Sequence, residues 1–333
     1  MIRIDEARIH DVIRQRGPAS VALNGPDGML PQVQAAASGV TREFGIPAYV
    51  LADTTWGSCD TNQAGAEALG AGVLFNIGHT IGMRELGGGY VVMVDAFDDI
   101  GFGRVAAECA KMLSGRTVSL LTDSQHLPQV GAVRDALEAG GVRVVVGAGG
   151  GQLNDAQVFG CEFYPAAKAA ADGAEANVFM GQSSFHAAGV ALSTGLPTYA
   201  LDPYFGEVRD VTGLAQKMQR RAAAAIYAAA DARTFGLIVG LKEGQLSRVT
   251  ALRLRRELEA EGREVQLLAM SSITADRLES LTGIDAFVQV ACPRISTDNP
   301  FRRPVLSVPP ADALLRVMRG GEPGEFLRAP HWL

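Results

Sequence analysis

The sequence has few cysteines, no excess of basic charge and no long apolar run, and each shortage argues against a class of protein. Its 4 cysteines among 333 residues stand far apart with no CxxC pair, which argues against a disulfide framework. A net charge of -6 argues against a general surface for nucleic acid phosphates. No stretch reaches the roughly 18 consecutive apolar residues of a membrane span, and the opening MIRIDEARIHDVIRQRG contains no apolar signal region. We therefore expect a cytoplasmic protein that binds neither nucleic acid nor a membrane directly.

Motifs of several cofactor-using classes are missing as well. No GxxxxGKS/T sequence occurs, so hydrolysis of a nucleoside triphosphate has no support. The CxxxCxxC spacing of conventional radical enzymes is also absent. The loop GAGGGQ at 147–152 lacks the full GxGxxG spacing and the helix that should follow at once. We interpret this loop as a flexible segment that carries a cysteine, and not as a dinucleotide site.

What the sequence does contain is a repeated alternation of apolar runs and helical segments. Hydrophobic residues make up 47% of the chain and 39 residues are glycine, a composition typical of α/β proteins with many turns. The apolar runs fall into three groups of four, which are 20–23, 48–53, 72–78 and 90–96, then 117–123, 143–149, 177–181 and 198–203, then 235–240, 264–270, 286–291 and 304–308. Continuous runs flanked by helices predict parallel strands buried on both faces.

The three groups divide the chain into similar thirds. Boundaries near 114 and 230 predict three α/β domains, at 1–114, 115–230 and 231–333, which agrees with the usual length of a domain. Each would be a small parallel sheet flanked by helices, and the three would surround a common site. The tail from Gly320 to the end is rich in glycine and proline without a period, so we expect a surface strap there.

One cysteine in each predicted domain follows a predicted strand. Cys59 lies in the turn WGSCDT, Cys161 follows the glycine-rich loop, and Cys292 ends the run 286–291. Ligands of open parallel sheets gather at loops that leave the carboxyl ends of strands, so three domains facing one centre would bring these thiols together. Cys109 lies instead inside a predicted helix among alanines, where a small buried thiol is the ordinary explanation.

Two metal sites are compatible with three cysteines. They could hold three irons of a cubane cluster and leave the fourth iron open to a substrate. A zinc ion with three cysteines and a water is the alternative. A zinc hydrolase would also need a carboxylate base, and no motif around the cysteines identifies one. The spacing in the sequence does not decide between them.

The stretches that carry the cysteines resemble a known family. WGSCDTNQAGAEALGAGVLFNIGHT, GQLNDAQVFGCEFYPA and IDAFVQVACPRISTDN are similar to the corresponding stretches of the archaeal-type 2-(3-amino-3-carboxypropyl)histidine synthases of diphthamide biosynthesis, and the likeness extends over nearly the whole chain. The resemblance implies a homodimer of three-domain α/β subunits. It also implies one 4Fe-4S cluster per subunit, held by Cys59, Cys161 and Cys292.

The resemblance further implies a transferase that uses S-adenosylmethionine as co-substrate. Members of the family cleave it by a radical mechanism into methylthioadenosine and a 3-amino-3-carboxypropyl group, which is added to C2 of a histidine on elongation factor 2. This is the first step of diphthamide formation, and it needs an electron donor. Two alternatives stay open, which are a cluster-bearing partner subunit without catalysis and a paralogue with a different acceptor.

The amino and carboxylate groups of such a co-substrate need polar partners. We expect contacts from GQSSFHAAG, where a turn leads into a helix whose N-terminus favours a carboxylate. The expected contacts are Gln182, Ser183, Ser184 and His186 from this turn, and His79 and Gln245 from other strand-end loops. Arg294 beside Cys292 could pair with a carboxylate or lower the pKa of a thiol. No side chain is assigned to catalysis itself.

Overall fold

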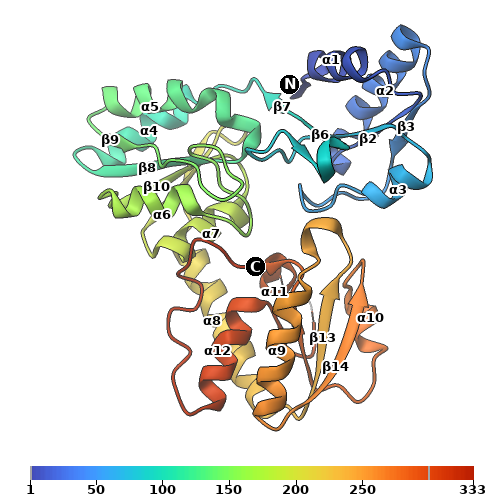
Figure 1. The fold of residues 1–333 in the computed structure, drawn as a ribbon. Coiled ribbons are helices and arrows are strands. Elements are labelled where there is room, and N and C mark those ends of the chain that lie inside the picture. Colours follow the sequence, from blue (N-terminus) through green and yellow to red (C-terminus); the bar gives the residue numbers. More distant parts are fainter. Residues whose placement is uncertain (1, 299–300) are drawn as a thin grey trace.

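The structure is a computed structural model that describes residues 2–298 and 301–333. Three sheets, each flanked by helices, follow one another along the chain (Figure 1). Every apolar run expected to be a strand contains one, so the predicted α/β class with three parallel-stranded units is confirmed. The described helices include none with the length and apolar character needed to cross a membrane.

The first sheet has the strand order β3-β2-β4-β6-β5, in which only β5 pairs antiparallel. Its strands are β2 (Val21–Asn24), β3 (Ala48–Leu51), β4 (Val73–Ile77), β5 (Glu85–Leu86) and β6 (Val91–Val94), and its helices are α1 (Glu6–Arg16), α2 (Leu30–Phe44) and α3 (Gln63–Ala68). Short 3-10 turns η1 (Asp27–Met29) and η2 (Gly87–Gly89) and the antiparallel pair β1 (Ile2–Ile4) and β7 (Ala96–Asp98) complete it. Every residue of β6 is buried, which explains its uninterrupted apolar run.

The second sheet has the order β12-β11-β10-β8-β9 and is parallel except for β12. Its strands are β8 (Thr117–Thr122), β9 (Arg143–Val145), β10 (Ala176–Met180), β11 (Thr198–Asp202) and β12 (Glu207–Asp210), and its helices are η3 (Ser124–Gln129), α5 (Val130–Ala139), α6 (Tyr164–Ala171) and α7 (Ser184–Thr194). β9 ends four residues before the expected limit at 149, because the chain there turns into the glycine-rich loop.

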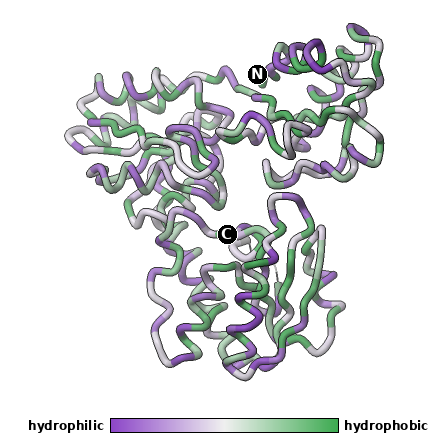
Figure 2. Tube along the Cα trace, in the orientation of Figure 1, coloured by the Kyte–Doolittle hydropathy of each residue, from purple (hydrophilic) through white to green (hydrophobic). Residues whose placement is uncertain are grey.

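The third sheet, drawn in orange and red in Figure 1, is entirely parallel with the order β14-β13-β15-β16. Its strands are β13 (Thr234–Gly240), β14 (Glu264–Met270), β15 (Ala286–Gln289) and β16 (Val305–Leu306), and its helices are α8 (Thr212–Ala230), η4 (Glu243–Gln245), α9 (Arg248–Ala260), α10 (Ala275–Glu279), α11 (Pro293–Asp298) and α12 (Val308–Met318). The hydropathy colouring of Figure 2 shows apolar residues along its strands. One apolar cluster joins Phe163 and Phe179 of the second unit to Phe235 and Leu237 of the third, so these two units share a core.

The helix α4 (Gly103–Leu113) packs on the second sheet, although the expected boundary at 114 places it in the first domain. Val105 and Cys109 of α4 share an apolar cluster with Val118 and Leu120 of β8. The apolar face of α4 is therefore buried against the strand that follows it in sequence. We propose that the first domain boundary lies before Gly103. We also propose that the second lies before Thr212 and not near 230, because Ile226 and Ala229 of α8 pack with Leu314 of α12.

The C-terminal tail is more than the surface strap that its composition predicts. Trp332 is 1% exposed, and its ring lies 4.8 Å from that of Phe163 between centroids. The backbone N–H of Trp332 donates to the carbonyl of Cys161 at 3.0 Å, and the N–H of Phe163 donates to the carbonyl of Pro330 at 2.7 Å. The tail is thus anchored in the core beside one of the cysteines.

Candidate functional site

The three strand-end cysteines come together from the three sheets. Cys59 lies between β3 and α3, Cys161 between β9 and α6, and Cys292 between β15 and α11, and all three are partly buried. Burial raises the pKa of Cys161 well above its usual value, and the nearby thiolates of Cys292 and Cys59 raise it further. Burial also raises the pKa of Cys292 to about 11, with Cys59 adding to the effect. The three thiols therefore lie within electrostatic range of one another.

The thiols do not converge on a single point. In the part of the chain that the structure describes, no three side chains of His, Cys, Asp or Glu lie close enough to hold one metal ion. A tetrahedral zinc ion requires its ligands to meet at one atom, whereas a cubane cluster binds its cysteines through separate irons. The three thiols are close enough to influence one another's pKa, and each could bind a separate iron. They therefore fit a cubane cluster better than a single zinc ion.

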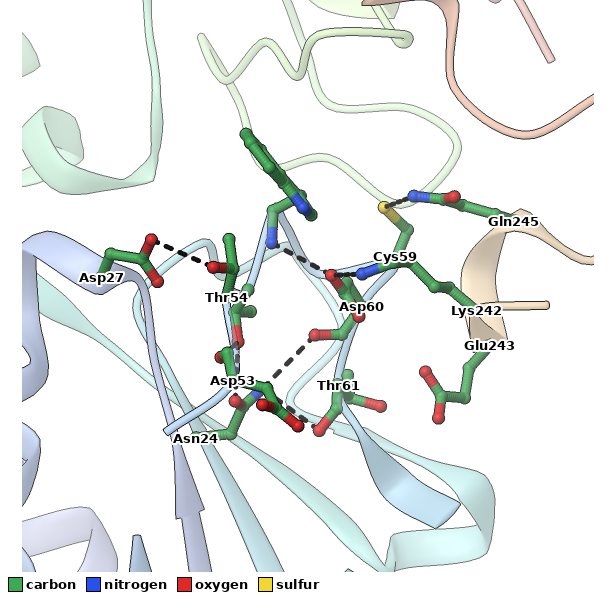
Figure 3. A network of polar contacts seen from close by, with 12 residues as sticks. Asn24, Asp27, Asp53, Thr54, Cys59, Asp60, Thr61, Lys242, Glu243 and Gln245 are labelled. Atoms are coloured by element: carbon green, nitrogen blue, oxygen red, sulfur yellow. Dashed lines mark hydrogen bonds and ion pairs between the residues drawn. The ribbon is translucent and has the colours of Figure 1, made fainter. Parts of the chain in front are cut away.

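The Cys59 turn is held on the ends of two buried strands by a polar network (Figure 3). The amide nitrogen of Asn24, which ends β2, donates to the carbonyls of Asp60 at 3.3 Å and Thr61 at 3.1 Å. It also donates to the side-chain oxygen of Asn76 at 3.0 Å, while the Thr55 hydroxyl donates to Asn24 at 2.7 Å. This network was not predicted from the sequence, although a lone asparagine at the end of an apolar strand is a signal for it.

A segment of the third unit contacts the same turn. Lys242 forms an ion pair with Asp60, and the backbone N–H of Gly244 donates to the Cys59 carbonyl at 3.0 Å. Gln245 is 8% exposed, and its amide nitrogen donates to the sulfur of Cys59 at 3.4 Å (Figure 3). This contact lowers the pKa of Cys59, but burial has the larger effect and raises it. Gln245 thus lies at the site, in contact with a cysteine sulfur.

Two glycines of the loop before Cys161, Gly147 and Gly149, lie against neighbouring backbone, and the flexibility of the loop stays a prediction. A Cβ on Gly147 would overlap the backbone carbonyl of Pro165, so glycine alone fits there. The backbone N–H of Gly149 donates to the carboxylate of Asp155 at 2.6 Å. These glycines allow backbone segments to approach closely, and this packing positions Cys161, which follows the loop.

The Cys292 turn is shaped by a buried glutamine, which was not predicted from the sequence either. The side-chain oxygen of Gln289 accepts the backbone N–H groups of Ala291 at 2.8 Å and Cys292 at 2.9 Å. Its amide nitrogen donates to the Cys292 carbonyl at 2.7 Å. Gln289 is fully buried at the end of β15, so a polar residue closing an apolar strand again marks a cysteine turn.

His186 lies in the first turn of α7 in an aromatic surrounding. Its ring stacks on Phe179 with centroids 6.1 Å apart, and Phe185 contacts it edge-on at 5.7 Å. The Ser183 hydroxyl caps α7 by accepting the backbone N–H of His186 at 3.3 Å, and it lies 2.6 Å from the ring Nδ1. Burial lowers the pKa of His186 to about 4, with His79 and Arg294 adding to the effect. His186 is therefore neutral at physiological pH.

Two residues of the predicted co-substrate turn are engaged by an arginine from the edge strand β12. Arg209 donates to the Ser184 hydroxyl at 3.0 Å and to the backbone carbonyl of Gln182 at 3.0 Å. It also pairs with the buried carboxylate of Asp202 at 3.2 Å. The Ser184 hydroxyl thus anchors the turn, whereas the side chain of Gln182 is exposed.

The two other histidines at strand ends differ. His79 has a left-handed backbone with φ 48°, and within the described residues its buried Nδ1 has no hydrogen-bond partner. Burial lowers the pKa of His79. His126 is 1% exposed, with its Nδ1 2.9 Å from the Gln129 side chain and its ring against Phe102. Of these two, only His79 neighbours His186 at the site.

Comparisons with known proteins agree with this architecture. The sequence matches the family model described as "Putative diphthamide synthesis protein" over residues 25–324. It is 29% identical to the 2-(3-amino-3-carboxypropyl)histidine synthase of Pyrococcus horikoshii over 332 residues, which are 98% of this chain and 94% of that protein. It is also 29% identical to human 2-(3-amino-3-carboxypropyl)histidine synthase subunit 1, over 93% of this chain and 71% of that protein.

A solved structure shares the fold over the whole length. The crystal structure of Dph2 from Pyrococcus horikoshii with a 4Fe-4S cluster matches with a TM-score of 0.86 and 29% identity, over 99% of this chain and 96% of that one. The family match and this structural likeness together cover all three sheets. The chain belongs to the family of diphthamide synthesis proteins.

Proposed function

We propose that this protein transfers the 3-amino-3-carboxypropyl group of S-adenosylmethionine to C2 of a histidine in elongation factor 2, as the first step of diphthamide biosynthesis. The observation that carries the proposal is the meeting of Cys59, Cys161 and Cys292, one from each sheet, within range of one another's charge. The names of the relatives support the same reaction.

The three cysteines are the proposed ligands of a 4Fe-4S cluster. When bound, such a cluster supplies the electron that cleaves a carbon–sulfur bond of the sulfonium. Three protein ligands leave one iron without a cysteine. Each cysteine must lose its proton to bind iron, and the raised pKa values of Cys161 and Cys292 mean that iron has to displace these protons.

The carboxylate of S-adenosylmethionine would bind among the histidines and the arginine beside the thiols. His79 offers a buried ring nitrogen that has no partner within the described residues. Ser183 caps the eleven-residue helix α7, and His186 lies in its first turn. The N-terminus of such a helix attracts an anion. Arg294 lies 5.3 Å from the ring of Phe185, next in sequence to His186. We assign Gln182 to the same pocket. We propose that Ser184 anchors the turn that carries Gln182 through Arg209, and that Gln245 contacts the Cys59 sulfur and not the co-substrate.

Elongation factor 2, an electron donor and a second copy of the chain are the proposed partners, in the cytoplasm. The eukaryotic relatives are named as subunit 1, which supports an active assembly of more than one chain. A paralogue with a different acceptor would share the site described above.

The test is an anaerobic incubation of the reduced, iron-loaded protein with S-adenosylmethionine, with and without elongation factor 2. Chromatography of the nucleosides should give methylthioadenosine, and the added group should appear on the elongation factor by mass spectrometry. Deoxyadenosine would contradict the proposed direction of cleavage. Iron-loaded protein without any product would favour a partner subunit that does not catalyse.

A further inference from the structure

The segment Lys242–Gln245, called the clamp segment here, ties the third unit to the Cys59 turn of the first. Besides the Lys242 ion pair and the Gly244 hydrogen bond, the Glu243 carboxylate accepts the backbone N–H of Gln63 at 2.9 Å. Every residue of the segment therefore contacts a stretch that lies about 180 positions earlier. Such dense pairing fixes the segment against the cysteine.

The amide of Gln245 is held in place within this segment. Its own backbone N–H donates to the Lys242 carbonyl at 2.9 Å, which closes a tight turn. Its side chain is 8% exposed, and a Cβ on Gly240 would lie only 3.1 Å from the Gln245 Cβ. The amide must point its N–H end toward a thiolate, because the negative sulfur would repel the carbonyl oxygen. Gln245 is thus a preorganised donor.

The surroundings of the other two sulfurs differ from this. At Cys292 the backbone N–H groups of Arg294 and Ile295 lower the pKa of the thiol, although burial has the larger effect and raises it. Around Cys161, burial and the neighbouring negative groups all disfavour the thiolate. The hydrogen bond to the Cys59 sulfur comes from a side chain, so a single substitution of Gln245 can remove it.

We infer that Gln245 is a positioning residue whose N–H···S hydrogen bond to Cys59 raises the reduction potential of the cluster held there. This inference rests on the proposed function. Hydrogen bonds to the sulfur ligands withdraw negative charge from an iron-sulfur cluster and so favour its reduced form. A donor carried by the third unit links the docking of that unit to the ease of cluster reduction.

The experiment measures the midpoint potential of the reconstituted full-length protein by anaerobic redox titration, followed by electron paramagnetic resonance. Gln245→Met keeps the length of the side chain and removes the donor, and Gln245→Glu replaces the donor by an anionic acceptor. We expect the potentials to fall in the order wild type, Gln245→Met, Gln245→Glu. The first step should change the reduction equilibrium about tenfold, which is about 59 mV for one electron. Gln216→Leu, at an exposed position of α8, is the control.

A second variant moves the donor without altering it. A Cβ on Gly244 would lie 2.6 Å from both Cα and Cβ of Cys59, so Gly244→Ala must push the clamp segment away. Its potential should fall toward that of Gln245→Met. Gly213→Ala is the matched control, because a Cβ there meets nothing within 4 Å.

The outcomes separate this inference from the proposed function. The inference alone would be overturned if the wild type assembles a cluster and Gln245→Met has the same midpoint potential as the wild type. A midpoint potential of Gln245→Glu equal to or above that of the wild type would overturn it as well. A wild-type protein that forms no cluster under reconstitution would overturn the proposed function and the inference with it. A packing defect alone would not lower the midpoint potential stepwise from wild type to Gln245→Met to Gln245→Glu.

Discussion

The Cys59 turn and the Cys161 loop occupy equivalent places in the first two sheets, yet their surroundings differ. Each cysteine carbonyl accepts one backbone N–H from a distant segment at 3.0 Å, from Gly244 for Cys59 and from Trp332 for Cys161. The clamp segment also brings a glutamine donor to the Cys59 sulfur. The acidic residue that follows each cysteine, Asp60 or Glu162, raises the pKa of the thiol at both sites, so the difference lies in the Gln245 donor. Equivalent positions in repeated folds thus acquire different electrostatics from the segments that dock on them.

The largest expected effect comes from removing the thiols themselves. Cys59→Ala, Cys161→Ala and Cys292→Ala should each lose cluster iron, because each removes one of three proposed ligands. Iron per chain and visible absorbance after anaerobic reconstitution measure this. Cys109→Ala should keep wild-type iron, since Cys109 is fully buried in an apolar cluster of α4. Equal iron in all four variants would refute the ligand assignment.

Removing the tail anchor should have the next largest effect and should act on the Cys161 side of the comparison. Trp332→Ala removes a ring that is 1% exposed, and truncating a buried tryptophan costs about 3–5 kcal/mol. The free energy of unfolding from urea titration measures this loss, and iron retention shows its effect on Cys161. Trp56→Ala is the matched control, because Trp56 is 63% exposed and should cost little. A stable Trp332→Ala variant would contradict the anchoring role of the tail.

The charge beside Cys161 should set a moderate pH effect on iron loading. Because burial and nearby negative groups raise the pKa of Cys161, its thiolate forms at higher pH and iron uptake should increase as pH rises. Glu162→Gln removes one of these negative groups and should shift the loading curve to lower pH.

The control for this shift is Glu108→Gln. Glu108 raises the pKa of Cys109, outside the site, so its removal should leave the loading curve unchanged. Loading curves of the wild type and Glu162→Gln that coincide would show that Glu162 does not govern Cys161.

The smallest expected effect concerns the stability of the iron-free protein in acid. The folded pKa of His186 is about 4 against an ordinary value of 6.5, so the unfolded chain binds the proton first as pH falls. The stability contributed by the neutral ring is full above about pH 6.5 and is lost as pH falls toward 4. Between about pH 8 and 5, the free energy of unfolding from urea titration should decrease less in His186→Gln than in the wild type. The difference should be on the order of 1 kcal/mol. Parallel losses in both proteins would rule out this origin.

The sequence by itself determined the strands and the placement of the cysteines at their ends. Apolar runs such as that of β6 depend on burial of both faces of a strand, and this requirement is visible locally in the residue types. The order of strand and following loop then places Cys59, Cys161 and Cys292 at the carboxyl ends of strands without knowledge of the contacts. The repeat in three groups likewise follows from the order of these runs.

Only the tertiary structure decided which distant segments support the site. The assignment of α4 to the second sheet, the anchoring of Trp332 and the contact of Gln245 with Cys59 all join residues through docking of whole units. Gln245 and Gln216 are the same residue type in the sequence, yet one is buried against a sulfur and the other is exposed. The physical reason is that a hydrogen bond or an apolar contact depends on distance in space. Between positions about 180 apart, that distance is set by the packing of the three sheets and leaves no periodic pattern in the chain.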